Sequence, residues 1–273
     1  MFHRHPSMQP RRALSLVEML IATTVMAVIA VSLASVSMSV EMGAAHADEK
    51  GDVTQRGRVA LSRVNNAMDN AHGTDQFPGY VVFPIVINGQ VYPDCVVIWS
   101  PDGAPADPVG LPLYSELVMF FPHATSPNQL LEVSFPGTDY TVPDLSQTAL
   151  WEWLIAYFRT SSFGDRVVLT DRLRTATVKN QGTGANATLG CIRFEVMYRP
   201  TDTQWNAYLA SSQTDADWAA LPWPQSIFSN STGIRQAWCR TEMQLNMTSS
   251  NSNTEVVVPF FGSAALHYQV PRP

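Results

Sequence analysis

The chain has 273 residues, of which 45 % are hydrophobic and 15 % are charged. This length allows one large domain or two small ones with a substantial apolar core. The formal net charge is −6, and Lys50 and Lys179 are the only lysines. A broad nucleic-acid-binding surface is therefore not expected, because such surfaces depend on clustered basic residues.

The first feature along the chain is an apolar stretch from Leu14 to Val40 whose only charged residue is Glu18. As a helix it would be about 40 Å long, which exceeds the bilayer hydrocarbon thickness of about 30 Å. Arginines precede the stretch and acidic residues follow it: Arg4, Arg11 and Arg12, then Glu41, Asp48 and Glu49. Because positive residues stay on the cytoplasmic side, we expect a cytoplasmic N-terminus and an exported remainder.

Three interpretations of this stretch compete. A secretory signal would be cut after the AHA at residues 45–47, but such signals use an apolar region of about 7–15 residues. A twin-arginine signal would rest on Arg11 and Arg12 alone, and adjacent arginines before a membrane segment are common for reasons of topology. The third interpretation depends on Glu18.

Residues 13–20, ALSLVEML, resemble the processing site of type IV prepilins and pseudopilins. In that family a short basic leader ends in Gly or Ala, followed by a hydrophobic residue, Ser or Thr, Leu, a variable residue and Glu. The resemblance implies a leader over residues 1–13 and cleavage between Ala13 and Leu14 by a prepilin peptidase. It also implies N-methylation of Leu14, and it makes Glu18 the fifth mature residue.

Cleavage before Leu14 would create an α-amine that must enter apolar surroundings. Residues four apart share one helix face, so Glu18 can reach that amine or the equivalent amine of a neighbouring subunit. A paired charge in hydrocarbon costs far less than an isolated one. The resemblance implies that Glu18 sets the register of subunits during assembly. The alternative is a carboxylate that merely extends to the membrane interface.

Residues 41–73 continue in a helical pattern. Apolar residues recur at steps of three, four or seven: Val53, Ala60, Val64, Met68 and Ala71. His72 and Gly73 predict the end of this helix. Gly43, Gly51 and Gly57 weaken it as an isolated helix by about 1 kcal/mol each. We therefore favour docking of this half on a sheet over a solvent-exposed linker helix.

The remainder, residues 74–273, predicts a single β-rich head domain. Alternating or apolar runs predict strands over 80–87, 95–100, 115–121, 129–135, 165–173, 189–198, 234–245 and 254–261. Asn88-Gly89 predicts a hairpin turn, and residues 146–159 predict a helix with Trp151, Leu154, Ile155 and Phe158 on one face. Residues 174–188 and 201–233 are polar and predict long surface loops. The fold class is therefore α+β, with a long N-terminal helix packed on an antiparallel β-sheet, which resembles pilin-type subunits.

No catalytic motif is present, so neither an enzyme nor a cofactor is expected. His46, His72, His123 and His267 have no neighbour at metal-ligand spacing, and no metal site is expected. Asp102 and Asp107 favour a turn over a calcium loop.

Cys191 and Cys239 both lie in strand-like runs and are the first choice for a disulfide, although buried free thiols are about equally compatible with the sequence.

Three further segments are candidates for surface roles. Trp153 and Tyr157 lie off the apolar stripe of the helix over 146–159, and core or loop-covered aromatics are favoured over an exposed partner-binding patch. Trp223, between two prolines, predicts either an exposed contact loop or a plug over a sheet edge. The basic residues of 166–179 are interleaved with aspartates and predict a solvated strand edge: Arg166, Arg172, Arg174 and Lys179.

Together these features predict a minor pilin or pseudopilin, a structural subunit at or near the tip of a type IV pilus or type II secretion filament. The mature length resembles larger minor subunits of the J-type pseudopilin or W-type minor pilin kind. The implied partners are the prepilin peptidase, other pilin or pseudopilin subunits and inner-membrane lipid, with no nucleic acid. The alternative is a membrane-tethered or secreted enzyme or ligand-binding protein whose export signal resembles a prepilin site.

Overall fold

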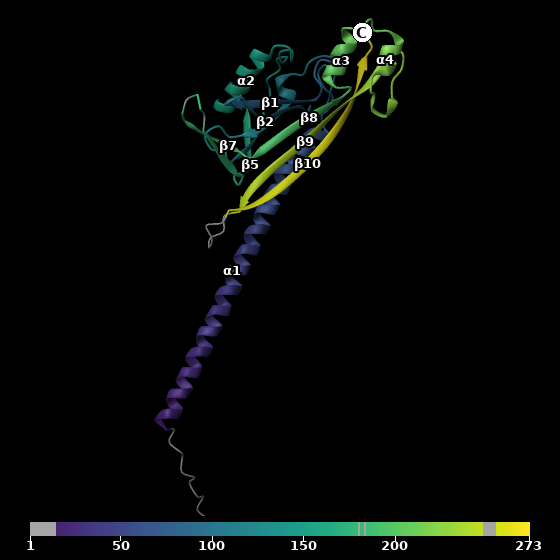
Figure 1. Ribbon diagram of the computed structural model, residues 1–273. Coiled ribbons are helices and arrows are strands. Elements are labelled where there is room, and N and C mark those ends of the chain that lie inside the picture. The colour runs from purple at the N-terminus through teal and green to yellow at the C-terminus, as the bar shows by residue number, and fades with distance from the viewer. Residues whose placement is uncertain (1–14, 180, 183, 248–254) are drawn as a thin grey trace, which may run out of the picture. The chain divides into compact units, whose positions relative to one another are not determined.

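The structure is a computed structural model that describes residues 15–179, 181–182, 184–247 and 255–273. The chain divides into two compact units, residues 1–49 and 50–273. Helix α1, Leu16–Asp69, contributes residues to both units, and the second unit contains all the strands that the structure describes (Figure 1). The predicted α+β class is confirmed, because the C-terminal part of this 54-residue helix contacts antiparallel sheets.

The larger sheet has five antiparallel strands in the order β1-β2-β3-β4-β5. Their bounds are Tyr80–Ile87, Gln90–Trp99, Leu117–Pro122, Leu130–Ser134 and Asp165–Thr170. Asn88 and Gly89 join β1 to β2 with positive φ angles of 55° and 75°. The predicted Asn-Gly hairpin turn is confirmed, since its tight turn needs positive φ at both central residues.

The second sheet has three antiparallel strands in the order β10-β9-β8. They span Ile192–Arg199 (β8), Thr232–Met247 (β9) and Val256–Pro271 (β10). Strands β9 and β10 pair along their whole length, from Met247 opposite Val256 to Thr232 opposite Pro271. The predicted strands over 234–245 and 254–261 are therefore parts of a much longer hairpin.

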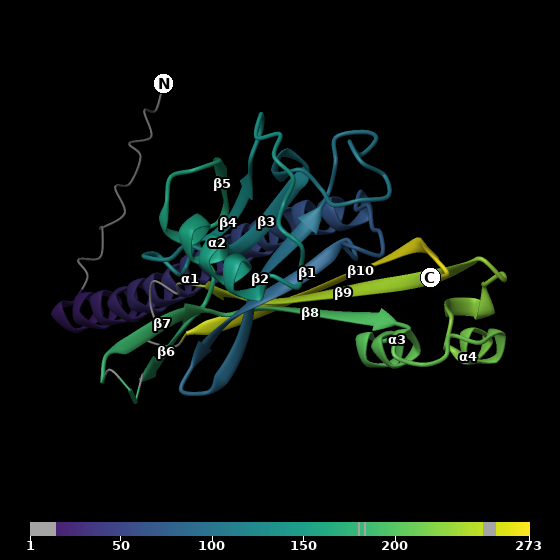
Figure 2. The same ribbon diagram turned by 90° about the horizontal axis from the view of Figure 1, so that it is seen from above.

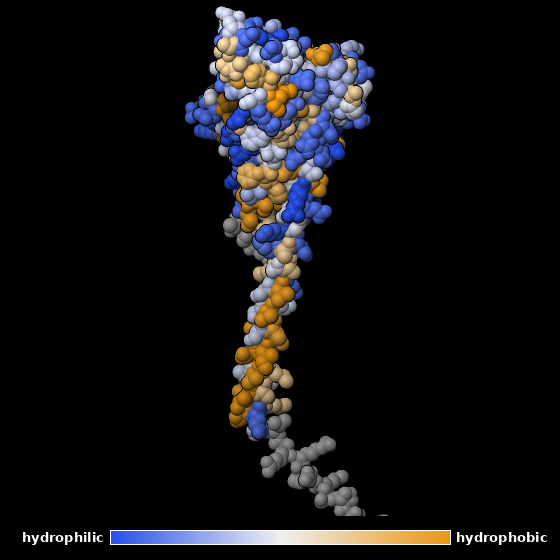
Figure 3. Space-filling view, turned by 90° about the vertical axis from the view of Figure 1, so that its right-hand side faces the viewer, coloured by the Kyte–Doolittle hydropathy of each residue, from blue (hydrophilic) through white to orange (hydrophobic). Residues whose placement is uncertain are grey.

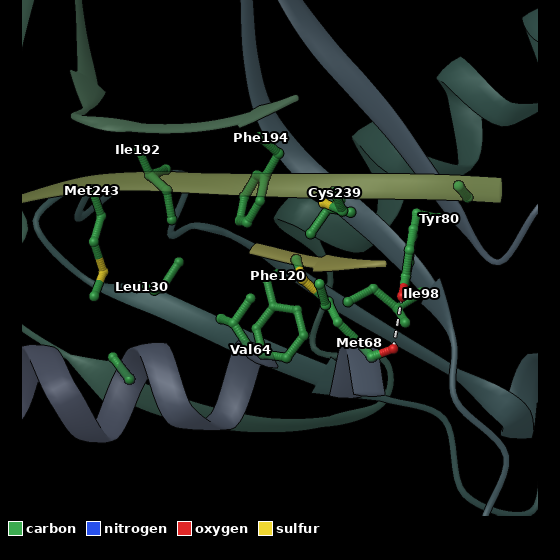
Figure 4. Close-up of a cluster of buried hydrophobic side chains, with 14 of the residues drawn as sticks. Val64, Met68, Tyr80, Ile98, Phe120, Leu130, Ile192, Phe194, Cys239 and Met243 are labelled. Carbon is green, nitrogen blue, oxygen red and sulfur yellow. Dashed lines mark hydrogen bonds between the residues drawn. The ribbon is translucent and has the colours of Figure 1, made fainter. Parts of the chain in front are cut away.

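Two apolar clusters hold the head together, one on each face of the five-stranded sheet. Helix α2, Thr148–Thr160, covers one face with the predicted stripe of Trp151, Leu154, Ile155 and Phe158. On the other face, β2 and β3 meet the three-stranded sheet and the C-terminal part of α1. Figure 4 shows this second cluster, in which Val64 and Met68 of α1 lie beside Phe120 and Ile98.

The predicted apolar face of α1 is confirmed, since Val53, Ala60, Val64 and Met68 are all buried. The helix ends at Asp69 and does not reach the predicted stop at His72 and Gly73. The Tyr80 hydroxyl donates a hydrogen bond to the carbonyl of Met68 at 2.8 Å, and the backbone amide of His72 donates to Trp99 at 2.8 Å. Contacts with the sheet thus end the helix before its local sequence signal does.

The two predicted long loops contain regular structure. Residues 174–188 overlap a hairpin of β6, Thr175–Lys179, and β7, Asn186–Gly190. Residues 201–233 contain helices α3, Asp202–Leu209, and α4, Asp215–Ala220. Both loop predictions were wrong in this respect. Two single-turn 3₁₀ helices, Tyr114–Glu116 and Pro224–Ser226, complete the described elements.

Candidate functional site

The N-terminus of α1 is held by a reciprocal pair of hydrogen bonds between Ser15 and Glu18. The backbone amide of Ser15 donates to Glu18 Oε2 at 2.9 Å, and the backbone amide of Glu18 donates to Ser15 Oγ at 3.2 Å. This arrangement is a capping box, which satisfies amides that a helix leaves unpaired at its start. Glu18 therefore has a local structural role that the sequence analysis missed, although the Ser-x-x-Glu spacing was its signal.

Most of the predicted processing site lies outside the described residues. This applies to the leader 1–13, to Arg11 and Arg12, and to the proposed scissile bond between Ala13 and Leu14. Glu18 lies exposed in the first turn of α1. Its carboxylate is close in sequence to the proposed new terminus, at the end of the helix where the dipole favours an anion.

The part of α1 in the first unit has an apolar surface, coloured orange along the helix in Figure 3. Its hydroxyl groups are satisfied within the helix: Thr24 Oγ1 donates to the Leu20 carbonyl at 2.7 Å, and Ser32 Oγ to the Val28 carbonyl at 2.8 Å. Such internal bonding removes the need for water at these hydroxyls. Within the described part of the chain, α1 is the one helix long and apolar enough to cross a membrane.

His123 and Asp107, two of the residues considered as metal ligands, have local roles. His123 Nδ1 accepts from the backbone amides of Thr125 and Ser126, and Asp107 Oδ1 accepts from the amides of Val109 and Gly110. These are turn-forming bonds. Among the described residues, no three His, Cys, Asp or Glu side chains are grouped as metal ligands would be.

The predicted disulfide between Cys191 and Cys239 is absent, and all three cysteines are free thiols. Cys239 lies opposite Val196 in the pairing of β8 with β9. The backbone amide of Cys191 donates to the carbonyl of Arg174, and the carbonyl of Cys191 accepts from the amide of Gln244. Gln244 is five positions from Cys239 along β9, which corresponds to about 17 Å. A disulfide needs Cα atoms within about 7 Å, so the strand register excludes this bond.

Thiol labelling will test this arrangement. Burial raises the pKa of Cys95 and of Cys239 to about 12 and also raises the pKa of the half-buried Cys191. Thiolates are the reactive form, so we expect the native chain to react with a maleimide slowly and mainly at Cys191. The unfolded, unreduced chain should react at all three thiols. Mass spectrometry that finds fewer than three labels after unfolding would contradict the free-thiol assignment.

The aromatic residues of α2 and of the Trp223 segment differ in their exposure to solvent. Trp153 and Tyr157 on α2 are 60 % and 42 % exposed, and their rings stack at 5.5 Å between centroids. The favoured core interpretation was therefore wrong for this pair. Trp223 is only 6 % exposed and packs in a cluster with Trp205, Tyr208 and Trp218, as expected of a plug.

The basic residues of 166–179 do not share one strand edge: Arg166 lies in β5 and Lys179 in β6, and Arg172 and Arg174 lie between these strands. Arg166 donates to the carbonyl of Phe158, and Arg174 contacts Gln244 at 3.0 Å and Glu255 at 3.4 Å. These arginines are bound to neighbouring elements of the head.

No family model, no curated protein and no solved structure matches this chain. What the structure itself supports is therefore the architecture of the chain. A long apolar N-terminal helix, whose C-terminal part packs on antiparallel sheets, is a pilin-like arrangement, and this chain has it.

Proposed function

We propose that this protein is a minor pilin or pseudopilin, a structural subunit of a type IV pilus or type II secretion filament. The observation that carries the proposal is Glu18, the only charged residue in the apolar stretch of residues 14–40 and the fifth residue after a potential cleavage site. The pilin-like architecture supports it. A prepilin peptidase would cut between Ala13 and Leu14 and methylate the new amine of Leu14.

The proposed mechanism is assembly, with no catalytic step by this chain. The helix over residues 14–40 is held in the inner membrane, with the N-terminus cytoplasmic and the head periplasmic. Neighbouring subunit helices then replace lipid around it, and Glu18 pairs with a terminal amine to set the register. The head contributes contacts to other subunits at or near the filament tip, as in the larger J-type or W-type minor subunits.

Mass analysis of the N-terminal peptide of protein recovered from its native cells will test the proposal. We expect a chain that begins with methylated Leu14. A chain that begins at Asp48 would instead indicate a secreted protein, and an intact Met1 would indicate a simple membrane tether. Either of these results would overturn the filament proposal in favour of an extracytoplasmic enzyme or ligand-binding protein.

Two substitutions separate the charge of Glu18 from its capping role. Glu18→Gln keeps a side-chain oxygen that can accept in a capping box but removes the negative charge. Ser15→Ala removes the other half of the box, at a cost of about 1 kcal/mol of helix stability, and leaves the charge. We expect Glu18→Gln to reduce incorporation into filaments at least tenfold and Ser15→Ala to leave incorporation nearly unchanged.

Sheared-filament fractions, compared by immunoblot at equal total protein, provide the measurement. Cleavage at Leu14 is checked in the same samples by mass, so that a processing defect is not mistaken for an assembly defect. Equal incorporation of Glu18→Gln and the natural chain would remove the register role. Loss in both variants would assign Glu18 to helix capping.

A further inference from the structure

A groove of about 950 Å³ runs along the outer edge of β1 in the head. Strand β1 pairs with β2 on one side only among the described strands, so it is an edge of the five-stranded sheet. Figures 1 and 2 show β1 between α2 and α3, and residues of all three elements line the groove. The groove lies entirely within the second unit of the chain.

Apolar side chains form part of the floor and walls of the groove. Val82, Phe83 and Ile85 of β1 are half-buried along the floor, and Ile155 and Trp205 contribute from the two helices. Val86 and Leu209 also line the groove and are 61 % and 40 % exposed. An apolar depression with exposed aliphatic side chains at its margin is typical of a surface that another molecule covers.

The charged groups of the groove leave it negative. Asp75, Asp144 and Glu152 are exposed lining residues, and none takes part in an ion pair within the described chain. Hydrogen bonds from the side chain and backbone of Ser146 hold the pKa of Asp144 below its ordinary value. That carboxylate therefore stays ionised over the physiological range.

The two arginines that line the groove do not offset this charge, because each is bound to a carboxylate. Arg159 donates two hydrogen bonds to Asp94, at 2.7 and 2.9 Å. Arg235 is buried, forms an ion pair with Asp202 and donates to the carbonyl of Pro200 at 3.2 Å. An excess of three unpaired carboxylates thus surrounds an apolar floor.

We propose that this groove binds a short segment of a partner protein in which apolar side chains lie next to lysine or arginine. The apolar side chains would cover β1 and the facing sides of α2 and α3. The basic side chains would reach Asp75, Asp144 and Glu152. Pro84 lies within β1 and has no amide hydrogen to offer, so a long added strand is disfavoured. Side-chain complementarity then determines the binding.

A labelled short peptide in which valine or leucine alternates with arginine will test the proposal by fluorescence anisotropy. The full chain is used in a non-ionic detergent, and the peptide's anisotropy in detergent alone is subtracted. We expect saturable binding that weakens about tenfold in the variant Asp75→Asn/Asp144→Asn/Glu152→Gln, from the sum of three exposed ion pairs. Peptides with glutamate in place of arginine, or serine in place of the apolar residues, should bind much more weakly.

A control variant changes net charge equally outside the groove: Asp48→Asn/Glu49→Gln/Asp102→Asn. We expect it to bind the peptide as the natural chain does. A second groove variant, Ala156→Phe, fills the space beside α2 and should abolish binding while circular dichroism and the unfolding midpoint stay unchanged. Ala156 is exposed on α2, so this larger side chain does not enter the core.

Three outcomes would overturn the proposal. These are equal binding by the acidic-groove and control variants, undiminished binding by Ala156→Phe, and binding of free arginine as tightly as the peptide. The last would indicate a small cationic ligand. The proposal does not depend on filament assembly. Its failure would leave the N-terminal mass result unaffected, and a non-filament N-terminus would leave the groove result standing.

Discussion

Asp94→Ala is expected to lower the free energy of unfolding of the head by about 3–5 kcal/mol. Asp94 on β2 and Arg159 on α2 form a two-fold hydrogen-bonded ion pair, and their side chains are only 7 % and 10 % exposed. Removal of the carboxylate leaves the Arg159 guanidinium uncompensated against the ring of Phe121. Urea unfolding of the full chain in non-ionic detergent, followed by tryptophan fluorescence, gives the measurement. Trp99 and Trp151 report on this region because they belong to the same apolar cluster as Phe121.

Two comparisons make this result specific to a buried charge. The variant Asp94→Leu/Arg159→Met should recover most of the lost stability, because apolar groups of similar size can replace a buried ion pair. Asp171→Ala breaks the exposed pair between Asp171 and Arg56 and should leave the unfolding midpoint almost unchanged, because exposed pairs contribute little. If Asp94→Ala shifts the unfolding midpoint no more than Asp171→Ala does, the Asp94–Arg159 ion pair does not stabilise the packing of α2 on the sheet.

Alanine substitutions at two glycines of α1 are expected to have opposite signs. At Gly51 an added Cβ meets no atom within 4 Å, so Gly51→Ala should raise the free energy of unfolding by up to about 1 kcal/mol. At Gly57 it would lie 2.2 Å from the ring of Phe260 on β10. Overpacking of this kind costs about 1–3 kcal/mol, so Gly57→Ala should lower the free energy despite its better helix propensity.

The contact between Gly57 and Phe260 is tested by combining Gly57→Ala with Phe260→Ala. In the background Phe260→Ala, the ring that blocks the added methyl is gone, so Gly57→Ala should become neutral or stabilising. The stabilities of the natural chain, the two single variants and the double variant form a double-mutant cycle, whose coupling we expect to exceed 1 kcal/mol for residues in direct contact. A coupling near zero would show that α1 does not approach β10 closely at Gly57.

The N-terminal helix α1 is where local sequence was most informative. A continuous apolar run predicts a membrane-length helix, and a periodic set predicts the face of α1 that packs on the sheets. Both features can be predicted from the sequence because they depend only on the order of residues within one helix. The Ser15–Glu18 capping box is equally local, since the Ser-x-x-Glu spacing alone indicates it.

The polar C-terminal segments show the limit of composition. Helices α3 and α4 each begin with a capping box, at Thr201–Gln204 and at Thr214–Asp217, which was a readable signal. Their short lengths and the Ser/Thr-rich surroundings favoured loops. Hairpin β6–β7 does alternate, with Ala176 and Val178 in β6 and Ala187 and Leu189 in β7, but its strands are short and more than half of their residues are exposed. The polar surroundings therefore favoured a loop. Pairing between the two strands, rather than burial, establishes the hairpin.

The sequence alone determined the long apolar helix, its packed face and the α+β class, because these follow from periodicity within single elements. Only the tertiary structure decided which elements meet. It placed Asp94 beside Arg159, 65 positions along the chain, separated Cys191 from Cys239 by strand register, and made Gly57 a site of close approach. It also brought β1, α2 and α3 together around an acidic groove. Such contacts depend on how sheets and helices stack, and no local pattern of residues encodes that arrangement.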